Sequence, residues 1–347
     1  MAIFGDSPSS VNRLNSCRKN LIVTLTTQSE IKLFLDLEPR SDTIFEDVIA
    51  GLSVCPKSLP SKYFYDARGS KLFDEICTLD EYYPTRTELS ILETHIEDIV
   101  ASLGDSVILV EYGSGSSIKT RLILEAIPET AAYVPIDISR EHLIDASVAL
   151  KKVFPGLNVL PVCGDYSQVI SLDLHDIVDG RISVFFPGST IGNFSREHAV
   201  QFMGRVHQLV GVGGGMLIGV DLVKDERLLH AAYNDSRGVT AAFNKNILSH
   251  INDRLGSSFL PSAFDHHAFY DPVMQRIEMQ LVSRVDQLVR VNGDSIRFYK
   301  GEAVRTEYSH KYCLDQFERM STEAGYITEK MWLDENEHFA VQYLRAI

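Results

Sequence analysis

Two glycines in the middle of the chain lie where an apolar segment ends and a helical segment begins. Gly113 and Gly115 follow the apolar run 107–110, and residues 119–127 have a helical pattern. A strand, a tight glycine turn and a helix together often hold a nucleotide. Because Ile118 stands where the dinucleotide fingerprint has its third glycine, the motif alone is weak and also fits an ordinary strand-to-helix turn.

Acidic residues at the ends of the apolar runs strengthen the nucleotide interpretation. Asp137 ends the next run, at a spacing from the glycines that allows an acid to bind both ribose hydroxyls. Asp165 ends the run after that and suits an adenine amino group. Glu111, beside the turn, would repel a pyrophosphate and tolerate a sulfonium cation. These acids favour S-adenosylmethionine, with a nicotinamide-dependent oxidoreductase as the runner-up.

The histidines and cysteines do not predict metal or disulfide chemistry. The 11 histidines include no H-E-x-x-H pattern, and the adjacent pair His266–His267 lacks a nearby ligand cluster. The five cysteines form no C-x-x-C pair. We therefore expect no metal site, and we interpret the cysteines as reduced thiols of a cytoplasmic protein.

Charge and hydropathy argue against two kinds of partner. The chain has 33 basic and 47 acidic side chains, a net charge of −14, with no basic stripe for a nucleic acid. No segment reaches the roughly 18 apolar residues that a membrane helix needs. The start of the chain also lacks the apolar core of a signal peptide. These features fit a soluble protein that acts on small molecules.

Five apolar runs alternate with helical segments and predict the core of the fold. The runs cover residues 106–112, 131–139, 157–165, 182–189 and 215–223. Such alternation indicates crossover connections and a parallel sheet that is covered on both faces. We therefore expect an α/β fold with a doubly wound sheet.

The pattern changes after residue 224. Residues 225–255 are helical in pattern, 276–284 alternate with period two, and a turn at 292–294 joins two antiparallel strands. A helix and two strands over 312–347 return to the core pattern. We infer that an insertion after the fifth strand forms a small α+β unit beside the sheet.

The N-terminal part of the chain carries weaker signals. Residues 1–20 look loosely attached, and the segments 20–27 and 31–38 could pair as a short hairpin. Residues 41–52 predict a helix, and the two prolines in 55–70 predict a loop.

Several segments, taken in order, resemble one protein family. They are SKYFYDARGSKLFDEI (61–76), EYGSGSSIKTRL (111–122), FFPGSTIGNF (185–194), GVDLVKD (219–225), AAYNDSRGVTAAFNKNIL (231–248), RIEMQL (276–281) and RTEYSHKY (305–312). From about residue 43 to its end, the chain is similar to the histidine-specific Nα-methyltransferases of ergothioneine biosynthesis. Their superfamily also contains fungal enzymes that methylate tryptophan-derived amines.

The resemblance implies a domain organisation. A class I methyltransferase core would be formed by residues 88–223 and 311–347, and a substrate-binding domain by 43–87 and 224–310. Residues 1–42 would be an N-terminal tail with the possible hairpin.

The resemblance also implies a cofactor site for S-adenosylmethionine. It is built from Tyr65, Gly113, Lys119, Asp137, Asp165 and Tyr166. Gly113 would allow close backbone approach, Asp137 would bind the ribose, and Asp165 would accept from the adenine amine. Tyr166, where the family often has Phe, would flank the adenine ring. The assignment of Lys119 rests on the family.

The substrate residues follow from the same resemblance. They are Tyr82, Gly188, Asn193, Tyr233, Met279, Glu307 and Ser309, with Tyr65 between the two ligands as the catalytic residue. Asn193 and Tyr233 would bind the substrate carboxylate. Near Tyr82, the capping-box spacing of Thr85 and Glu88 predicts that a helix starts there, with Tyr83 as a hydrophobic staple.

The segment RTEYS carries the ring specificity. In a strand, Glu307 and Ser309 share one face, with Thr306 and Tyr308 on the other. A carboxylate and a hydroxyl suit the two nitrogens of an imidazole, and Met279 would wall the ring or lie in the core. These residues favour histidine, and the alternative is N-methylation of a tryptophan derivative.

The implied reaction is methylation of the α-amino group of L-histidine, up to the trimethylated betaine hercynine. Catalysis would rest on proximity and orientation. Tyr65 would orient the amine and pass its proton to water, and the rings of Tyr65 and Tyr82 would stabilise the growing ammonium. We expect a monomer whose partners are small molecules.

Overall fold

The computed structural model describes residues 31, 34–37, 43–114, 118–127, 130–165, 172, 174 and 179–347. Within these residues the main sheet has eight strands, in the order β1-β5-β4-β3-β6-β7-β14-β13. Their bounds are β1 (Leu35–Asp36), β3 (Val107–Tyr112), β4 (Thr130–Asp137), β5 (Val162–Cys163), β6 (Arg181–Phe186), β7 (Gly215–Asp221), β13 (Tyr326–Leu333) and β14 (Phe339–Ala346). The neighbours from β1 to β7 pair in parallel, and β14 is antiparallel to both β7 and β13.

Helices cover both faces of this sheet. They are α3 (Tyr83–Leu103), α4 (Ile118–Ala126) and α5 (Arg140–Val153) on one face, and α6 (Arg196–Val210) and α9 (Leu314–Glu323) on the other. The strands β3 and β7 are buried along their whole length, because apolar side chains pack on both sides of the sheet. This doubly wound arrangement with one antiparallel strand near its edge is the class I methyltransferase fold, as the sequence predicted.

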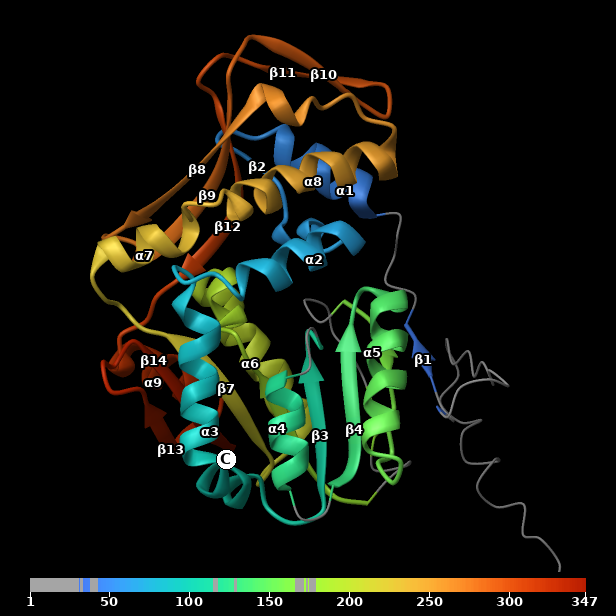
Figure 1. Cartoon of the computed structure of the whole chain (residues 1–347), viewed down its shortest axis with the longest axis vertical. Helices are drawn as coiled ribbons and strands as arrows, with labels where there is room; N and C mark the ends of the chain where they lie inside the picture. Colours follow the sequence, from blue (N-terminus) through green and yellow to red (C-terminus); the bar gives the residue numbers. More distant parts are fainter. Residues whose placement is uncertain are drawn as a thin grey trace, which may run out of the picture.

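A second, smaller unit lies beyond the carboxyl ends of the parallel strands (Figure 1). Its sheet has the order β2-β12-β9-β8, and a hairpin of β10 and β11 extends from it. The strands are β2 (Lys57–Ser58), β8 (Phe264–Asp271), β9 (Arg276–Ser283), β10 (Gln287–Val291), β11 (Asp294–Phe298) and β12 (Ala303–His310). Its helices are α1 (Thr43–Leu52), α2 (Ala67–Ile76), α7 (Glu226–Tyr233) and α8 (Val239–Leu255), with the 3-10 helices η1 (Ser61–Phe64) and η4 (Pro261–Ala263).

One hydrophobic core joins the two sequence segments of the smaller unit. Ile44, Val48 and Phe64 from the early segment pack with Ile247 and Leu281 from the later one. The segment between β1 and α3 and the insertion after β7 therefore fold against each other. The separate sheet and core of the smaller unit are compatible with the two domains expected from the sequence. The domain boundaries stay a prediction.

Two expectations about secondary structure were wrong, and one strand was missed. The segment 55–70 is not a simple loop, because it contains η1 and the start of α2, where Asp66 accepts a 2.6 Å hydrogen bond from the Gly69 N–H. The run 157–165 has only the two paired residues of β5 as a strand. The strand β8 was not predicted, because its polar residues hide the alternation.

The start of α3 also differs from the predicted capping box. The helix begins at Tyr83, its cap residue Tyr82 makes no side-chain cap bond, and Glu88 is fully buried among other partners. Tyr83 is not a hydrophobic staple, because it is the first residue of the helix and not the residue before the cap. Its hydroxyl donates to Asp221 at 2.7 Å. A buried carboxylate facing a cation is more strongly held than one that caps an exposed helix end.

The N-terminal residues 35–36 extend the main sheet as β1, in parallel with β5. The segment 20–27 of the possible hairpin and the candidate caps Ser41 and Asp42 lie outside the described residues. In the described part of the chain, no helix combines the length and the apolar character that crossing a membrane requires.

Candidate active site

A cavity of about 530 Å³, open mouth included, lies between the two units. Its walls come from both, because η3 (Thr190–Asn193) follows β6 of the main sheet while β9, β12, α7 and α8 belong to the smaller unit. The lining residues are Tyr65, Phe73, Ile76, Tyr82, Gly188, Ser189, Thr190, Asn193, Ala232, Tyr233, Thr240, Phe243, Met279, Glu307 and Ser309. The structure thus brings all seven predicted substrate residues and Tyr65 to one cavity, although it does not test their roles.

The turn after β6 has an unusual backbone. Gly188 has a φ of +76°, and Ser189, with a φ of +54°, is also in the left-handed region. The Gly188 N–H donates to the Glu88 carboxylate at 2.8 and 3.0 Å, and the Ser189 hydroxyl accepts from the Asp221 N–H at 2.9 Å. These bonds fix the turn that carries Asn193 to the cavity.

Aromatic side chains form one wall of the cavity. The Tyr65 ring lies edge-on to Phe73 and Phe243, with 5.8 Å between ring centroids in each pair. The Tyr82 ring lies edge-on to Tyr233 at 6.3 Å. Burial raises the pKa of the Tyr82 hydroxyl, so this group is a neutral donor. Such a wall excludes water and can contact a cation through ring faces.

The strand β12 supplies the polar residues at the far end. Glu307 and Ser309 face the cavity. The register of β12 shifts between Arg305 and Glu307, and the Thr306 hydroxyl donates to Asn244 of α8, a helix that also lines the cavity, at 2.7 Å. Met279 of β9 pairs with Glu307 in the sheet register. Burial raises the pKa of Glu307 to about 8, although the charge of Lys311 opposes this shift. The face shared by Glu307 and Ser309 is confirmed, whereas the strict alternation that put Thr306 on the opposite face was wrong, because the register shifts there.

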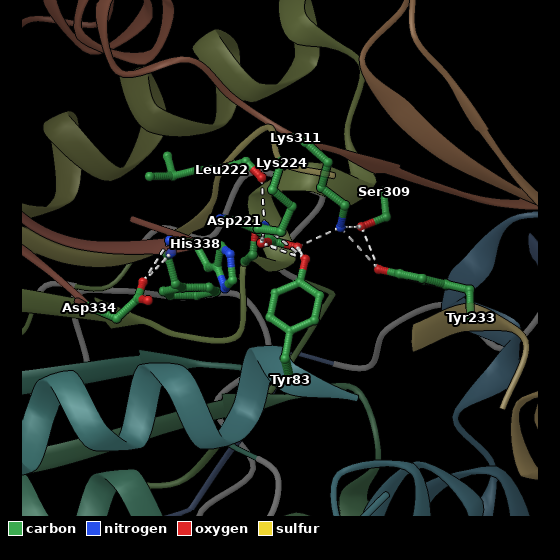
Figure 2. A network of polar contacts seen from close by, with 11 residues as sticks. Tyr83, Asp221, Leu222, Lys224, Tyr233, Ser309, Lys311, Asp334 and His338 are labelled. Atoms are coloured by element: carbon green, nitrogen blue, oxygen red, sulfur yellow. Dashed lines mark hydrogen bonds and ion pairs between the residues drawn. The ribbon is translucent and has the colours of Figure 1, made fainter. Parts of the chain in front are cut away.

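Behind the cavity lies a buried network of charges that the sequence did not predict (Figure 2). The Lys311 ammonium lies 2.7 Å from Asp221, which also pairs with Lys224. Lys311 donates to Ser309 at 2.8 Å and to Tyr233 at 3.2 Å. Burial opposes ionisation of Asp221, but the two lysines outweigh it and lower its pKa.

Three of the predicted cofactor residues, Gly113, Asp137 and Asp165, lie at the carboxyl ends of β3, β4 and β5. Gly113 has a φ of +74°, and its N–H donates to Ile136 at 2.9 Å. Asp137 accepts a 2.7 Å bond from the Ser139 N–H, and burial raises its pKa. Asp165 lies 3.4 Å from the ammonium of Lys62. Tyr166 and Gly115 lie outside the described residues.

Two charged residues near the glycine turn have partners within the protein. Lys119 forms an ion pair with the buried Glu88. Glu111 accepts hydrogen bonds from the hydroxyls of Thr120 and Tyr133, and burial raises its pKa to about 7. The Glu111 carboxylate is thus bound within the protein, and the argument that its charge favours a sulfonium cofactor stays a prediction.

Three functional candidates were missed by sequence reasoning, namely Glu88, Asp221 and Lys311. The signal for Asp221 was a charged residue inside the apolar run 215–223, which is costly unless it is paired. Nothing in the local pattern identified its partner Lys311, because the two are distant in sequence.

Comparisons with known proteins agree with this architecture. The model of a family described as "Histidine-specific methyltransferase, SAM-dependent" matches residues 44–346. The histidine N-alpha-methyltransferase of Mycolicibacterium smegmatis is 40% identical over 306 residues, which cover 87% of this chain and 94% of that protein. Ergothioneine biosynthesis protein 1 of Neurospora crassa is 29% identical and matches 82% of this chain and 32% of its own length. A 4-dimethylallyltryptophan N-methyltransferase of Penicillium roqueforti is 26% identical, over 84% of this chain and 90% of its own.

Proposed function

Because the chain belongs to the family of SAM-dependent, histidine-specific methyltransferases, we propose that it methylates the α-amino nitrogen of L-histidine. Up to three transfers would give the betaine hercynine, an intermediate of ergothioneine biosynthesis. One observation carries the proposal: Glu307 and Ser309 face the same cavity from β12, with Met279 beside them. A carboxyl and a hydroxyl at one end of a cavity with an aromatic wall suit a small polar ring.

The substrate roles are proposals that rest on the family and on the cavity. Glu307 and Ser309 would each serve one nitrogen of the imidazole. Asn193 and Tyr233 would donate to the carboxylate, and the Gly188 backbone would lie against the amino acid moiety. Unpaired partner groups would penalise a ring that lacks either nitrogen.

The residues at the glycine turn fit S-adenosylmethionine. Ser114, next to Gly113, is buried, and its hydroxyl has no hydrogen-bond partner among the residues described. Asp137 is available to two ribose hydroxyls at the end of β4. When bound, the cofactor supplies a methyl group on a positively charged sulfur. Gly113, Lys119, Asp137, Asp165 and Tyr166 would hold it.

The chain's own contribution is orientation and proton handling. Attack requires a neutral amine, so the α-ammonium must first lose a proton. Tyr65, in the aromatic wall, would align the nitrogen and pass that proton to water. Tyr82 and Tyr65 would present ring faces to the cationic product. With the nitrogen held in line, proximity supplies most of the rate.

N-methylation of a tryptophan derivative is the second candidate. The Penicillium relative favours it, at lower identity than the mycobacterial one. An indole has one N–H and no ring acceptor, so it would leave Glu307 or Ser309 unpaired in a buried site, at a cost of roughly 1–3 kcal/mol. We therefore prefer histidine.

The direct test incubates the full chain with S-adenosylmethionine and each common amino acid in turn, and reads product masses. We expect histidine alone to gain one, two or three methyl groups. A product from tryptophan or another amine, with none from histidine, would replace the proposal by the second candidate.

A second measurement tests recognition of the carboxylate. Histamine keeps the imidazole and the amine, so its kcat/KM should fall at least roughly tenfold below that of histidine if two donors bind the carboxylate. Equal turnover of the two compounds would show that the carboxylate is not read.

We also propose a monomer in the cytoplasm, with residues 43–87 and 224–310 as its substrate domain. Four described cysteines are free, which suits a reducing compartment. Light scattering at assay concentration tests the monomer.

A further inference from the structure

The ammonium of Lys311 is committed entirely within the protein. Its side chain is 1% exposed, and its three neighbours are Asp221 at 2.7 Å, Ser309 at 2.8 Å and Tyr233 at 3.2 Å. An ammonium has three protons and no lone pair. Each proton therefore has one acceptor, and none remains for a ligand in the cavity.

Two of these acceptors also touch each other. The Tyr233 hydroxyl donates to the Ser309 hydroxyl at 2.7 Å, and both residues line the cavity. Since Lys311 already donates to both oxygens, one hydroxyl must donate to the other. The two hydroxyls carry two protons between them. One of these protons lies in the bond between the hydroxyls, so only the other can be donated to a ligand.

This inference deepens the proposed function and rests on it. We propose that Lys311 is a positioning and specificity residue, which binds Tyr233 and Ser309 into a unit that offers the substrate only one hydroxyl proton. When the substrate carboxylate accepts a hydrogen bond from the Tyr233 hydroxyl, the bond between the two hydroxyls must reverse, so that Ser309 donates to Tyr233. Its remaining lone pair then faces the ring and accepts an imidazole N–H.

Glu307 completes the arrangement at the other ring nitrogen. Burial raises the pKa of Glu307 to about 8, which favours the protonated carboxyl at neutral pH. The protonated carboxyl can donate to the unprotonated ring nitrogen. The unit thus connects recognition of the carboxylate at one end of the substrate with recognition of the ring at the other.

Lys224 provides a matched control. It pairs with the same carboxylate of Asp221 and bonds to Tyr83 at 2.8 Å and Leu222 at 2.6 Å. None of the contacts described for it involves Ser309 or Tyr233. Lys224→Met and Lys311→Met each remove one buried ammonium from Asp221, and only the second disturbs the hydroxyls.

The test compares histidine with 3-(2-thienyl)alanine, whose five-membered ring has no N–H. We expect Lys311→Met to lower the kcat/KM preference for histidine at least roughly tenfold, mainly through KM, as expected for loss of a charge-assisted bond. Lys224→Met should keep the preference within about twofold. In a Ser309→Ala background, Lys311→Met should not change the preference further. Binding of S-adenosylhomocysteine should stay constant throughout.

If Lys311→Met and Lys224→Met lose the same kcat/KM and both keep the wild-type preference for histidine over thienylalanine, the inference is overturned. Lys311 would then only neutralise Asp221. Independent effects of Lys311→Met and Ser309→Ala would also overturn it. If Lys311→Met does not fold, Tyr233→Phe decides: it frees the Ser309 proton, so the ring preference must fall although Tyr233 is assigned to the carboxylate. An unchanged preference there contradicts the inference. Wild-type protein that does not methylate histidine would instead refute the proposed function itself.

Discussion

At the scale of single residues, the cavity contains polar groups whose pKa values are shifted by burial. Glu307 is a carboxyl whose pKa is raised to about 8, in a site with aromatic walls. Such a group is costly without a partner, so it selects a ligand that supplies one. The identity of the ring should therefore depend on this residue more than on the apolar walls.

Replacing Glu307 with alanine should change the substrate preference. Histidine loses the partner of one ring nitrogen, about 1.5–3 kcal/mol of binding, whereas larger apolar rings gain space and avoid a buried carboxyl. A competition assay with equal histidine and tryptophan, read by mass, measures the shift, with the exposed Glu323→Ala as control. A product ratio equal to wild type would mean that Glu307 does not read the ring.

The raised pKa of Glu307 also predicts how stability varies with pH. Between its ordinary value of 4.5 and about 8, the folded state holds a proton that the unfolded state has lost. The free energy of unfolding therefore falls as pH rises through this window. Glu307→Gln removes the effect, so its Tm relative to wild type should rise by a few degrees from pH 5 to pH 8.5. A Tm difference that stays constant with pH would contradict the shifted pKa.

At the scale of elements, Glu88 connects three parts of the site. Its carboxylate, on α3, pairs with Lys119 of α4 and accepts the Gly188 N–H from the turn after β6. Because Glu88 is fully buried, these bonds have no competition from water. A helix, the proposed cofactor lysine and the substrate turn therefore share one acceptor.

Glu88→Ala should destabilise the protein and weaken both ligands. Removing one partner of a buried ion pair leaves Lys119 uncompensated, at a cost of roughly 3 kcal/mol in the free energy of unfolding. Urea unfolding and calorimetry with histidine and S-adenosylhomocysteine measure the two effects. Glu93→Ala, an exposed position on the same helix, should stay within about 0.5 kcal/mol of wild type. Normal affinity for both ligands in the Glu88 variant would rule out this connecting role.

At the scale of the whole molecule, the site lies where two units meet. The main sheet brings Gly113 and Asp137 to its carboxyl edge, and the smaller unit brings Glu307 and Ser309 to the cavity. Lys62 and Asp165, 3.4 Å apart, connect the two sides. Changes on one side should therefore affect one ligand more than the other.

Asp137→Ala tests this separation. Loss of a charged partner for the ribose hydroxyls should weaken cofactor binding by about 1.5–3 kcal/mol and leave the preference for histidine over tryptophan unchanged. Calorimetry and the competition assay report the two quantities, with Asp145→Ala on the exposed side of α5 as control. Unchanged cofactor affinity in a folded variant would reject Asp137 as the ribose ligand.

The sequence by itself determined the doubly wound core, the insertion after β7 and the face shared by Glu307 and Ser309. These features depend on local patterns, because apolar runs mark buried strands and period two assigns the faces of a strand. The family motifs also identified residues that the structure gathers around one cavity.

Only the tertiary structure decided which charged groups became partners. Glu88 has the spacing of a helix cap, yet it pairs with Lys119, and Asp221 pairs with Lys311 from another part of the chain. Charge pairing is non-local and carries no periodic signal, whereas burial makes it obligatory. The network behind the cavity therefore follows from how the two units pack, and no short stretch of sequence contains it.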